Sequence, residues 1–134
     1  MVSLELAKKL KDAGLVWEPK EGDRLYYDDK LELLNKENLE SARRLHNLTA
    51  RHQEYQDMAP VFAPSLSQLL AEIEGRGYRS ALVSNDMAKW PAKWNCDIVK
   101  PESFIDCLVY RVWADTPDDA TALALLHILE VGIG

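Results

Sequence analysis

The chain has 134 residues and a mass of 15.2 kDa, a length typical of one domain, so we predict a single domain over residues 1–134. Apolar residues make up 47% and charged residues 28%, a composition that excludes a disordered chain, a collagen, a disulfide scaffold and a membrane-spanning protein. Acidic residues outnumber basic ones 22 to 16, giving a net charge of −6. This balance argues against a dedicated binder of nucleic acids or anionic membranes, because both need a basic face.

The N-terminal residues and the cysteines indicate a cytoplasmic protein. In residues 1–9 the lysines follow the apolar residues, whereas a secretory signal has the opposite order and a longer apolar run. No segment approaches the ~18 consecutive apolar residues of a membrane-spanning helix, so no membrane association is expected. Cys96 and Cys107 are the only cysteines, and their spacing fits neither a zinc motif nor a redox pair. We therefore expect two reduced thiols, no metal and no cofactor.

The N-terminal residues are predicted to form a helix followed by a hairpin. Ser3 is placed to cap a helix over residues 4–13, and Gly14 is placed to end it. Two apolar and aromatic segments then flank a turn at residues 19–23, which contains proline and glycine. We expect these segments to pair as a hairpin over residues 15–27.

Residues 31–56 are predicted to form one long helix, which makes a helical insertion of about residues 28–57. The segment holds no proline and no glycine, and it is rich in Leu, Glu, Arg and Ala. A seam with 3-4 spacing runs along it through Leu31, Leu34, Asn38, Ser41, Leu45, Leu48, His52 and Tyr55. Such a seam is typical of a helix that packs against a second copy or against the rest of its own chain.

The middle of the chain carries the clearest signals for element boundaries. Prolines at both ends of residues 60–64 bracket a short extended piece. Ser65 and Gln68 have the spacing of a capping box, which opens a helix that ends near Gly75. The apolar run that follows predicts a strand over residues 78–84.

The C-terminal residues are predicted to form two strands and a helix. The strands are expected over residues 94–99 and 104–113, joined by a turn at 100–103. Thr116 is placed to cap a final helix over residues 117–131. Nine of the last twelve positions of this helix are apolar, so it must be covered on more than one side.

This order of elements predicts an α+β fold, with an antiparallel sheet, helices mainly on one face and a long helical excursion at about 28–57. A two-residue loop at 101–102 would place Cys96 directly opposite Cys107 on the neighbouring strand. Their α-carbons would then lie within the ~7 Å reach of a disulfide, although the cytoplasm would keep both thiols reduced.

No residue pattern identifies a catalytic or cofactor site. The chain has no glycine-rich nucleotide motif, no zinc-protease motif and no nucleophile motif. His46 and His52 are six residues apart, about 240° around a helix, so they cannot bind one metal from the same face. Two alternatives stay open: a metal-dependent hydrolase that uses His46 or His52 with acids such as Asp57, and a nucleic-acid binder that uses the basic helix face from Arg43 to Arg51.

Protein–protein binding is the function that these observations favour. Trp90 and Trp94 flank a proline-containing turn, where full burial is difficult. The apolar final helix and the leucine seam exceed what one short domain needs to bury, so we expect a homo-oligomer or another protein as the partner. The predicted contact residues are Leu31, Leu34, Leu45, Leu48, Trp90 and Trp94.

Three stretches of helix caps and turns carry a resemblance to a known group of proteins. They are residues 6–14 with 17–23, residues 63–74 with 77–78, and residues 116–120 leading into 124–129. Together they resemble small proteins encoded by phages and by prophage regions of bacteria. The resemblance covers about half of the chain, leaves out residues 28–57 as an insertion and implies no catalytic activity. It implies a cytoplasmic accessory protein of a mobile element.

Overall fold

The computed structural model describes residues 1–84, 93–102 and 105–131, with the backbone alone for residues 53, 56, 57, 102, 105 and 106. The described elements are α1 (Leu4–Asp12), β1 (Arg24–Tyr27), β2 (Lys30–Leu33), α2 (Leu39–Arg51), the 3₁₀ helix η1 (Gln53–Met58), β3 (Val61–Ala63), α3 (Leu66–Gly75), β4 (Arg79–Ser84), β5 (Trp94–Glu102), β6 (Ile105–Ala114) and α4 (Pro117–Val131). The predicted α+β class is confirmed.

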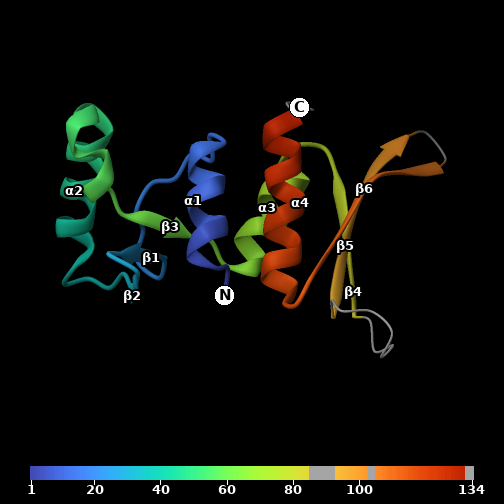
Figure 1. Cartoon of the computed structure of the whole chain (residues 1–134), viewed down its shortest axis with the longest axis horizontal. Helices are drawn as coiled ribbons and strands as arrows, with labels where there is room; N and C mark the ends of the chain where they lie inside the picture. Colours follow the sequence, from blue (N-terminus) through green and yellow to red (C-terminus); the bar gives the residue numbers. More distant parts are fainter. Residues whose placement is uncertain (85–92, 103–104, 132–134) are drawn as a thin grey trace.

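The described strands form two antiparallel sheets instead of the expected single sheet. Their strand orders are β2-β1-β3 and β4-β5-β6, with three strands in each. Figure 1 shows α1, α3 and α4 between the two sheets, and α2 beyond the smaller sheet at one end of the molecule. The helices α3 and α4 cover one face of β4-β5-β6 (Figure 1). This agrees with the prediction that helices lie mainly on one face of the sheet.

Three of the described helices are capped at their N-termini by the side chains that the sequence predicts. Ser3 Oγ accepts from the backbone N–H three residues ahead at 3.3 Å, and Thr116 Oγ1 does the same at 3.1 Å. Ser65 and Gln68 form the predicted capping box, with bonds of 3.2 Å and 2.8 Å. These bonds satisfy backbone donors that the first turn of a helix leaves without a partner. Gly14 follows α1 with φ +100°, a conformation that suits glycine.

The hairpin predicted over residues 15–27 is wrong. The strand β1 pairs with β2, which follows it directly, and Tyr27 lies opposite Lys30. Asp28 and Asp29 make the two-residue turn, with φ of 44° and 70°. A tight hairpin turn of this kind needs positive φ at both central residues, and aspartate tolerates it better than most residues do. The chain therefore forms a second strand directly after this turn, in a segment where the spacing of the leucines favoured a helix.

The single long helix predicted over residues 31–56, and with it the fully helical insertion at 28–57, is also wrong. Residues 30–33 form β2, and the α-helix begins at Leu39. Asn35 Oδ1 accepts from the backbone N–H of Asn38 at 3.0 Å, and Asn38 Oδ1 accepts from that of Asn35 at 2.7 Å. Asparagine side chains that bond nearby backbone groups compete with helix formation. The α-helix therefore begins only after a strand and a loop.

The predicted pairing of Cys96 with Cys107 is wrong because the strands continue past the expected turn. Cys96 lies opposite Val112, and Cys107 lies opposite Lys100, four residues or about 13 Å further along β5. Pro101 belongs to β5, which β4 accompanies only as far as Val99, so the missing N–H of proline interrupts no ladder on that side. The connection at 103–104 lies outside the described residues.

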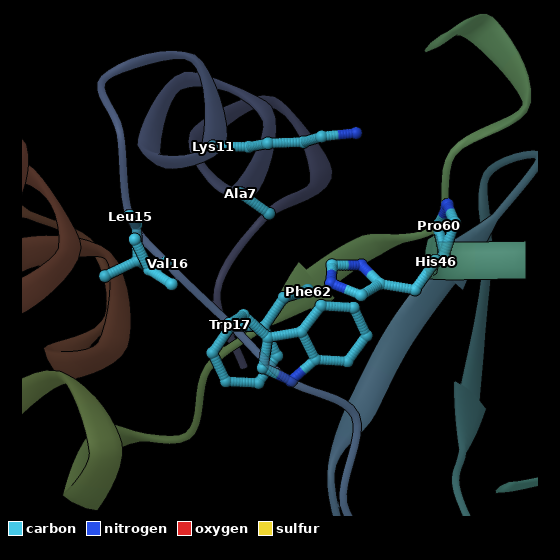
Figure 2. Close-up of a pocket in the computed structure, with 8 residues that line it drawn as sticks. All are labelled: Ala7, Lys11, Leu15, Val16, Trp17, His46, Pro60 and Phe62. Atoms are coloured by element: carbon cyan, nitrogen blue, oxygen red, sulfur yellow. The ribbon is translucent and has the colours of Figure 1, made fainter. Parts of the chain in front are cut away.

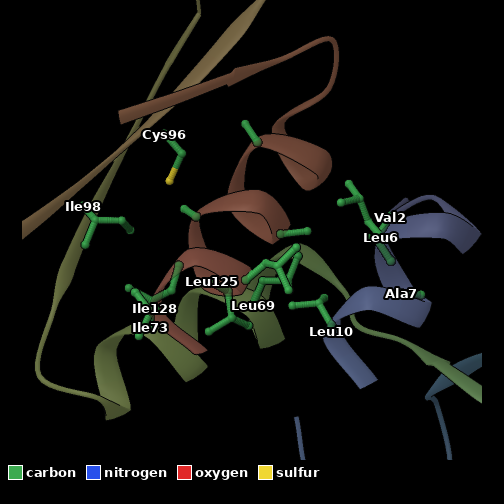
Figure 3. Close-up of a cluster of buried hydrophobic side chains, with 14 of the residues drawn as sticks. Val2, Leu6, Ala7, Leu10, Leu69, Ile73, Cys96, Ile98, Leu125 and Ile128 are labelled. Atoms are coloured by element: carbon green, nitrogen blue, oxygen red, sulfur yellow. The ribbon is translucent and has the colours of Figure 1, made fainter. Parts of the chain in front are cut away.

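The main core lies between α1, α3, α4 and the inner face of β4-β5-β6 (Figure 3). On α4 its fully or nearly fully buried side chains are Ala120, Thr121, Ala122, Ala124, Leu125, Leu126 and Ile128. The final helix is thus covered on more than one side by its own chain, as its apolar residues predict, so this helix by itself gives no reason to expect a partner. A second, smaller cluster of Leu25, Leu34 and Ala42 holds α2 against the small sheet.

The two cysteines should differ sharply in reactivity. Cys96 is fully buried, and this burial raises the pKa of its thiol to about 11, whereas Cys107 is exposed. Because the thiolate is the reactive form, we expect a thiol reagent at pH 8 to label one cysteine per folded chain and two per unfolded chain. Rapid labelling of both cysteines in the folded protein would contradict the burial of Cys96.

Candidate functional site

The sheet β4-β5-β6 has one face that the described helices leave uncovered. Side chains alternate across a strand, and Cys96 and Ile98 of β5 point toward α4, where both are fully buried (Figure 3). Asp97, which lies between them in sequence, points to the opposite side of the sheet. We call that side the outer face. In register across the three strands it holds Arg79, Ala81 and Val83 of β4, Asn95, Asp97 and Val99 of β5, and Leu108, Arg111 and Trp113 of β6.

An ion pair occupies the centre of the outer face. Arg111 Nε donates to Asp97 Oδ1 at 2.7 Å, and Arg111 Nη2 donates to Asp97 Oδ2 at 2.9 Å. Asn95 Nδ2 donates to Asp97 Oδ1 at 3.0 Å. These bonds, with Arg111 the stronger contributor, hold the pKa of Asp97 below its ordinary value. Both charges are therefore satisfied within the chain, and the pair adds no net charge to the face.

Apolar side chains surround this ion pair and remain open to solvent. The exposed fraction is 45% for Val83, 53% for Leu108 and 43% for Trp113. Val109, which lies at the irregularity in the β5–β6 pairing, is 38% exposed. Tryptophan and arginine dominate binding energy in protein interfaces, so their combination with exposed aliphatic residues indicates a contact surface.

The structure separates the leucines that the sequence placed on one seam. Leu34 is 1% exposed in the second core cluster, and Leu31 lies on β2 with 42% exposed. Leu45 and Leu48 lie on α2, where Leu45 is half-buried and Leu48 is 46% exposed. The single helical seam is therefore wrong, while a contact role for these residues stays a prediction. Trp94 is half-buried against the main core, and Trp90 lies outside the described residues.

The residues of the two alternative functions are also dispersed. His52 is exposed at the C-terminal end of α2 with its ring 5.9 Å from that of Tyr55, whereas His46 is half-buried six residues earlier. The side chain of Asp57 lies outside the described residues. Among the described side chains, His, Cys, Asp and Glu form no group of three that could hold a metal. Arg43 forms an ion pair with Glu40 at 3.5 Å on the same helix.

Sequence reasoning missed a hollow of about 210 Å³ between α1, residues 15–17, α2 and β3, which we call the Trp17 pocket (Figure 2). It is lined by Ala7, Lys11, Leu15, Val16, Trp17, His46, Pro60 and Phe62. The ring of Trp17 stacks on Phe62 with centroids 4.9 Å apart and planes 7° apart. The His46 ring meets Trp17 edge-on at 5.1 Å. No local pattern predicts it, because its residues come from four separate segments.

A buried carboxylate fixes the indole ring of this pocket. Asp23 is 8% exposed, and its Oδ2 accepts from Trp17 Nε1 at 3.0 Å and from the backbone N–H of Lys20 at 3.1 Å. Its Oδ1 accepts from Gln68 Nε2 at 2.8 Å, a bond that ties the turn before β1 to the start of α3. The sequence placed Asp23 at the end of a turn and gave no sign of this role.

Burial lowers the pKa of His46 below its ordinary value of 6.5, and the nearby charge of Lys11 lowers it further, against smaller opposing effects of Glu18 and of a hydrogen bond to the Trp17 backbone. In the pH range between that lowered value and 6.5, the unfolded chain binds a proton at His46 that the folded chain does not. The stabilisation is therefore complete above pH 6.5 and is lost as pH falls through the folded-state pKa.

We expect His46→Gln to flatten the pH dependence of stability in this range. Unfolding by urea at pH 7.5 and at half-unit steps down to pH 5.5 measures the effect. The wild-type protein should lose more stability than the variant over these steps. Equal slopes for the two proteins would contradict the lowered pKa.

No family of proteins, no curated protein and no solved structure matches this chain. Among the described helices, none combines the length and the apolar character that crossing a membrane requires.

Proposed function

We propose that the protein is a non-enzymatic binding module that associates with a second copy of itself through the outer face of β4-β5-β6. The observation that carries this proposal is the outer face itself, where Val83, Leu108 and Trp113 stay exposed around the Asp97–Arg111 ion pair. This surface replaces the leucine seam and the final helix as the reason to expect association.

The charge of the chain favours a second copy as the occupant of this face. With a net charge of −6, two copies repel each other across most of their surfaces. Among its described side chains the outer face holds two bases, Arg79 and Arg111, and one acid, Asp97, so this face is less acidic than the chain as a whole. A two-fold axis through this face would bring the apolar residues of two copies together, while the carboxylate of each Asp97 stays paired with Arg111 of its own chain.

The size of the face sets the expected strength of association. Strands β5 and β6 have nine and ten residues. Together with the six residues of β4, these strands, spaced about 4.8 Å apart, cover roughly 400 Å². A stable complex buries about 800 Å² on each partner, so we expect a weak and reversible dimer that forms at tens to hundreds of micromolar.

The resemblance of the helix caps and turns to phage and prophage proteins supports a biological setting. On that resemblance, the module is a cytoplasmic accessory protein of a mobile element. Neighbouring genes test this setting: a phage lysis, replication or packaging cassette would support it, and a set of bacterial housekeeping genes would contradict it.

Sedimentation velocity between 10 and 500 µM tests the self-association. The wild-type protein should sediment faster as its concentration rises, and a Leu108→Thr, Trp113→Thr double variant should remain a 15.2 kDa monomer throughout. Threonine keeps the strand preference of these positions while removing most of the apolar surface. A wild-type protein that remains monomeric at 500 µM would refute the proposal.

Leu48→Gln is the matched control, because Leu48 is as exposed as the outer-face residues but lies on α2. This variant should associate like the wild type. If it dissociates while the double variant still associates, the interface lies on α2 and not on the sheet.

A further inference from the structure

The walls of the Trp17 pocket combine an aromatic floor with a cation at the rim. Figure 2 shows the Trp17 and Phe62 rings overlapping, with His46 beside them and Lys11 extending from α1 on the opposite side of the hollow. Leu15 and Val16 close one side of this floor. A flat apolar group can therefore lie against a ring while one of its substituents reaches the ammonium group.

Contacts within the chain hold the aromatic floor in place. The Trp17 indole is held by its hydrogen bond to Asp23 and by stacking on Phe62. Asp23 is in turn held by Gln68 at 2.8 Å. A site whose walls are already fixed loses little conformational entropy on binding, which favours affinity for a small ligand.

The charge at the pocket favours an anion despite the acidity of the whole chain. Within the described part of the chain, Lys11 forms no ion pair, although its ammonium group is partly desolvated and its pKa is lowered for that reason. The positive charge of Lys11 lies close enough to His46 to lower its pKa, while Glu18 opposes this effect and Asp12 raises the pKa of Lys11 itself. A carboxylate beside Lys11 would supply the missing counter-charge.

From the walls, the charge and the size together, we propose that the Trp17 pocket binds a small aromatic carboxylate, with its ring on Trp17 and its carboxylate beside Lys11. A cavity of about 150 Å³ holds benzene, and pockets for drug-sized ligands begin at about 300 Å³. The hollow of about 210 Å³ thus fits one ring with a short acidic arm. This proposal is independent of self-association, because α1, α2 and β3, which contribute residues to the pocket lining, lie on the other side of α4 from β4-β5-β6 (Figure 1).

Titration with phenylacetate and with its neutral analogue phenylacetamide, followed by ¹H–¹⁵N NMR, tests the proposal. We expect phenylacetate to shift the indole N–H signal of Trp17 with a Kd of about 0.1–1 mM, as befits a ligand with so few atoms. Phenylacetamide should bind about tenfold more weakly, because it cannot form a charge-assisted bond with Lys11. Phenylacetate that leaves the Trp17 signal unchanged at 10 mM would overturn the proposal.

Two lysine variants on the same helix locate the cation. Lys11→Met keeps the aliphatic stem and should remove the tenfold preference for phenylacetate while leaving the binding of phenylacetamide unchanged, which also shows that the variant is folded. Lys8→Met removes the same charge from α1 outside the pocket and should keep the preference. If Lys11→Met retains the preference, or if Lys8→Met loses it equally, the assignment of Lys11 is refuted.

Discussion

Replacing Asp23 with alanine should lower the free energy of unfolding by about 3 kcal/mol. The change leaves three donors without their acceptor: Trp17 Nε1, the backbone N–H of Lys20 and Gln68 Nε2. Each lost bond to a buried or half-buried group costs about 1 kcal/mol, and bonds to a charged acceptor lie at the upper end of the range. Urea unfolding followed by circular dichroism measures the difference.

Glu21→Ala is the control for the loss of one negative charge in the same turn. Glu21 is exposed, so its removal should change the free energy of unfolding by less than about 0.5 kcal/mol. If Asp23→Ala lowers the free energy of unfolding no more than Glu21→Ala does, the carboxylate does not hold Trp17 and Gln68 in place. The account of how the aromatic floor of the Trp17 pocket is fixed would then be wrong.

Leu125→Ala should lower the free energy of unfolding by about 3–4 kcal/mol, the cost typical of a leucine truncated inside a well-packed core. Leu125 is fully buried at the centre of the main core, between α4 and the helices around it (Figure 3). The loss should be the same at 5 and at 100 µM protein, because the chain itself supplies the covering residues.

Leu123→Ala provides the comparison on the same helix. Leu123 is only half-buried, so we expect its truncation to cost about 1 kcal/mol. A cost for Leu125→Ala that depends on protein concentration would instead mean that a partner covers α4, as the sequence alone suggested.

The elements that the sequence predicted correctly are those set by signals within a few residues. Ser3, Ser65 with Gln68, and Thr116 each cap the helix that they were expected to cap. Caps and glycine stops act through the first or last turn of a helix, so they need no knowledge of the tertiary structure. The strands β5 and β6 were predicted for the same reason, from a local excess of β-branched and aromatic residues.

The errors lie where local hydrogen bonds and register overrode the apolar spacing. Asp28 and Asp29 turn the chain back on itself, and Asn35 and Asn38 bond each other's backbone, so a segment with helical spacing begins as a strand. The β5–β6 register was misplaced because Pro101 was taken as a turn residue. A shift in register of this kind moves each residue to a different neighbour.

The candidate surfaces required the tertiary structure for a different reason. The alternation of Arg111 and Trp113 with Tyr110 and Val112 is visible in the sequence, but it does not say which face the helices cover. The Trp17 pocket depends on Asp23 and Gln68, which are 45 residues apart and meet only in the folded chain.

Comparison of ¹H–¹⁵N NMR spectra at 20 and 500 µM tests self-association through the outer face most directly. Signals that move with concentration should belong to Asp97, Arg111, Trp113 and their neighbours on β4, β5 and β6, while those of α2, including Leu45 and Leu48, should stay fixed. Spectra that superimpose at the two concentrations, or shifts that gather on α2, would contradict the account.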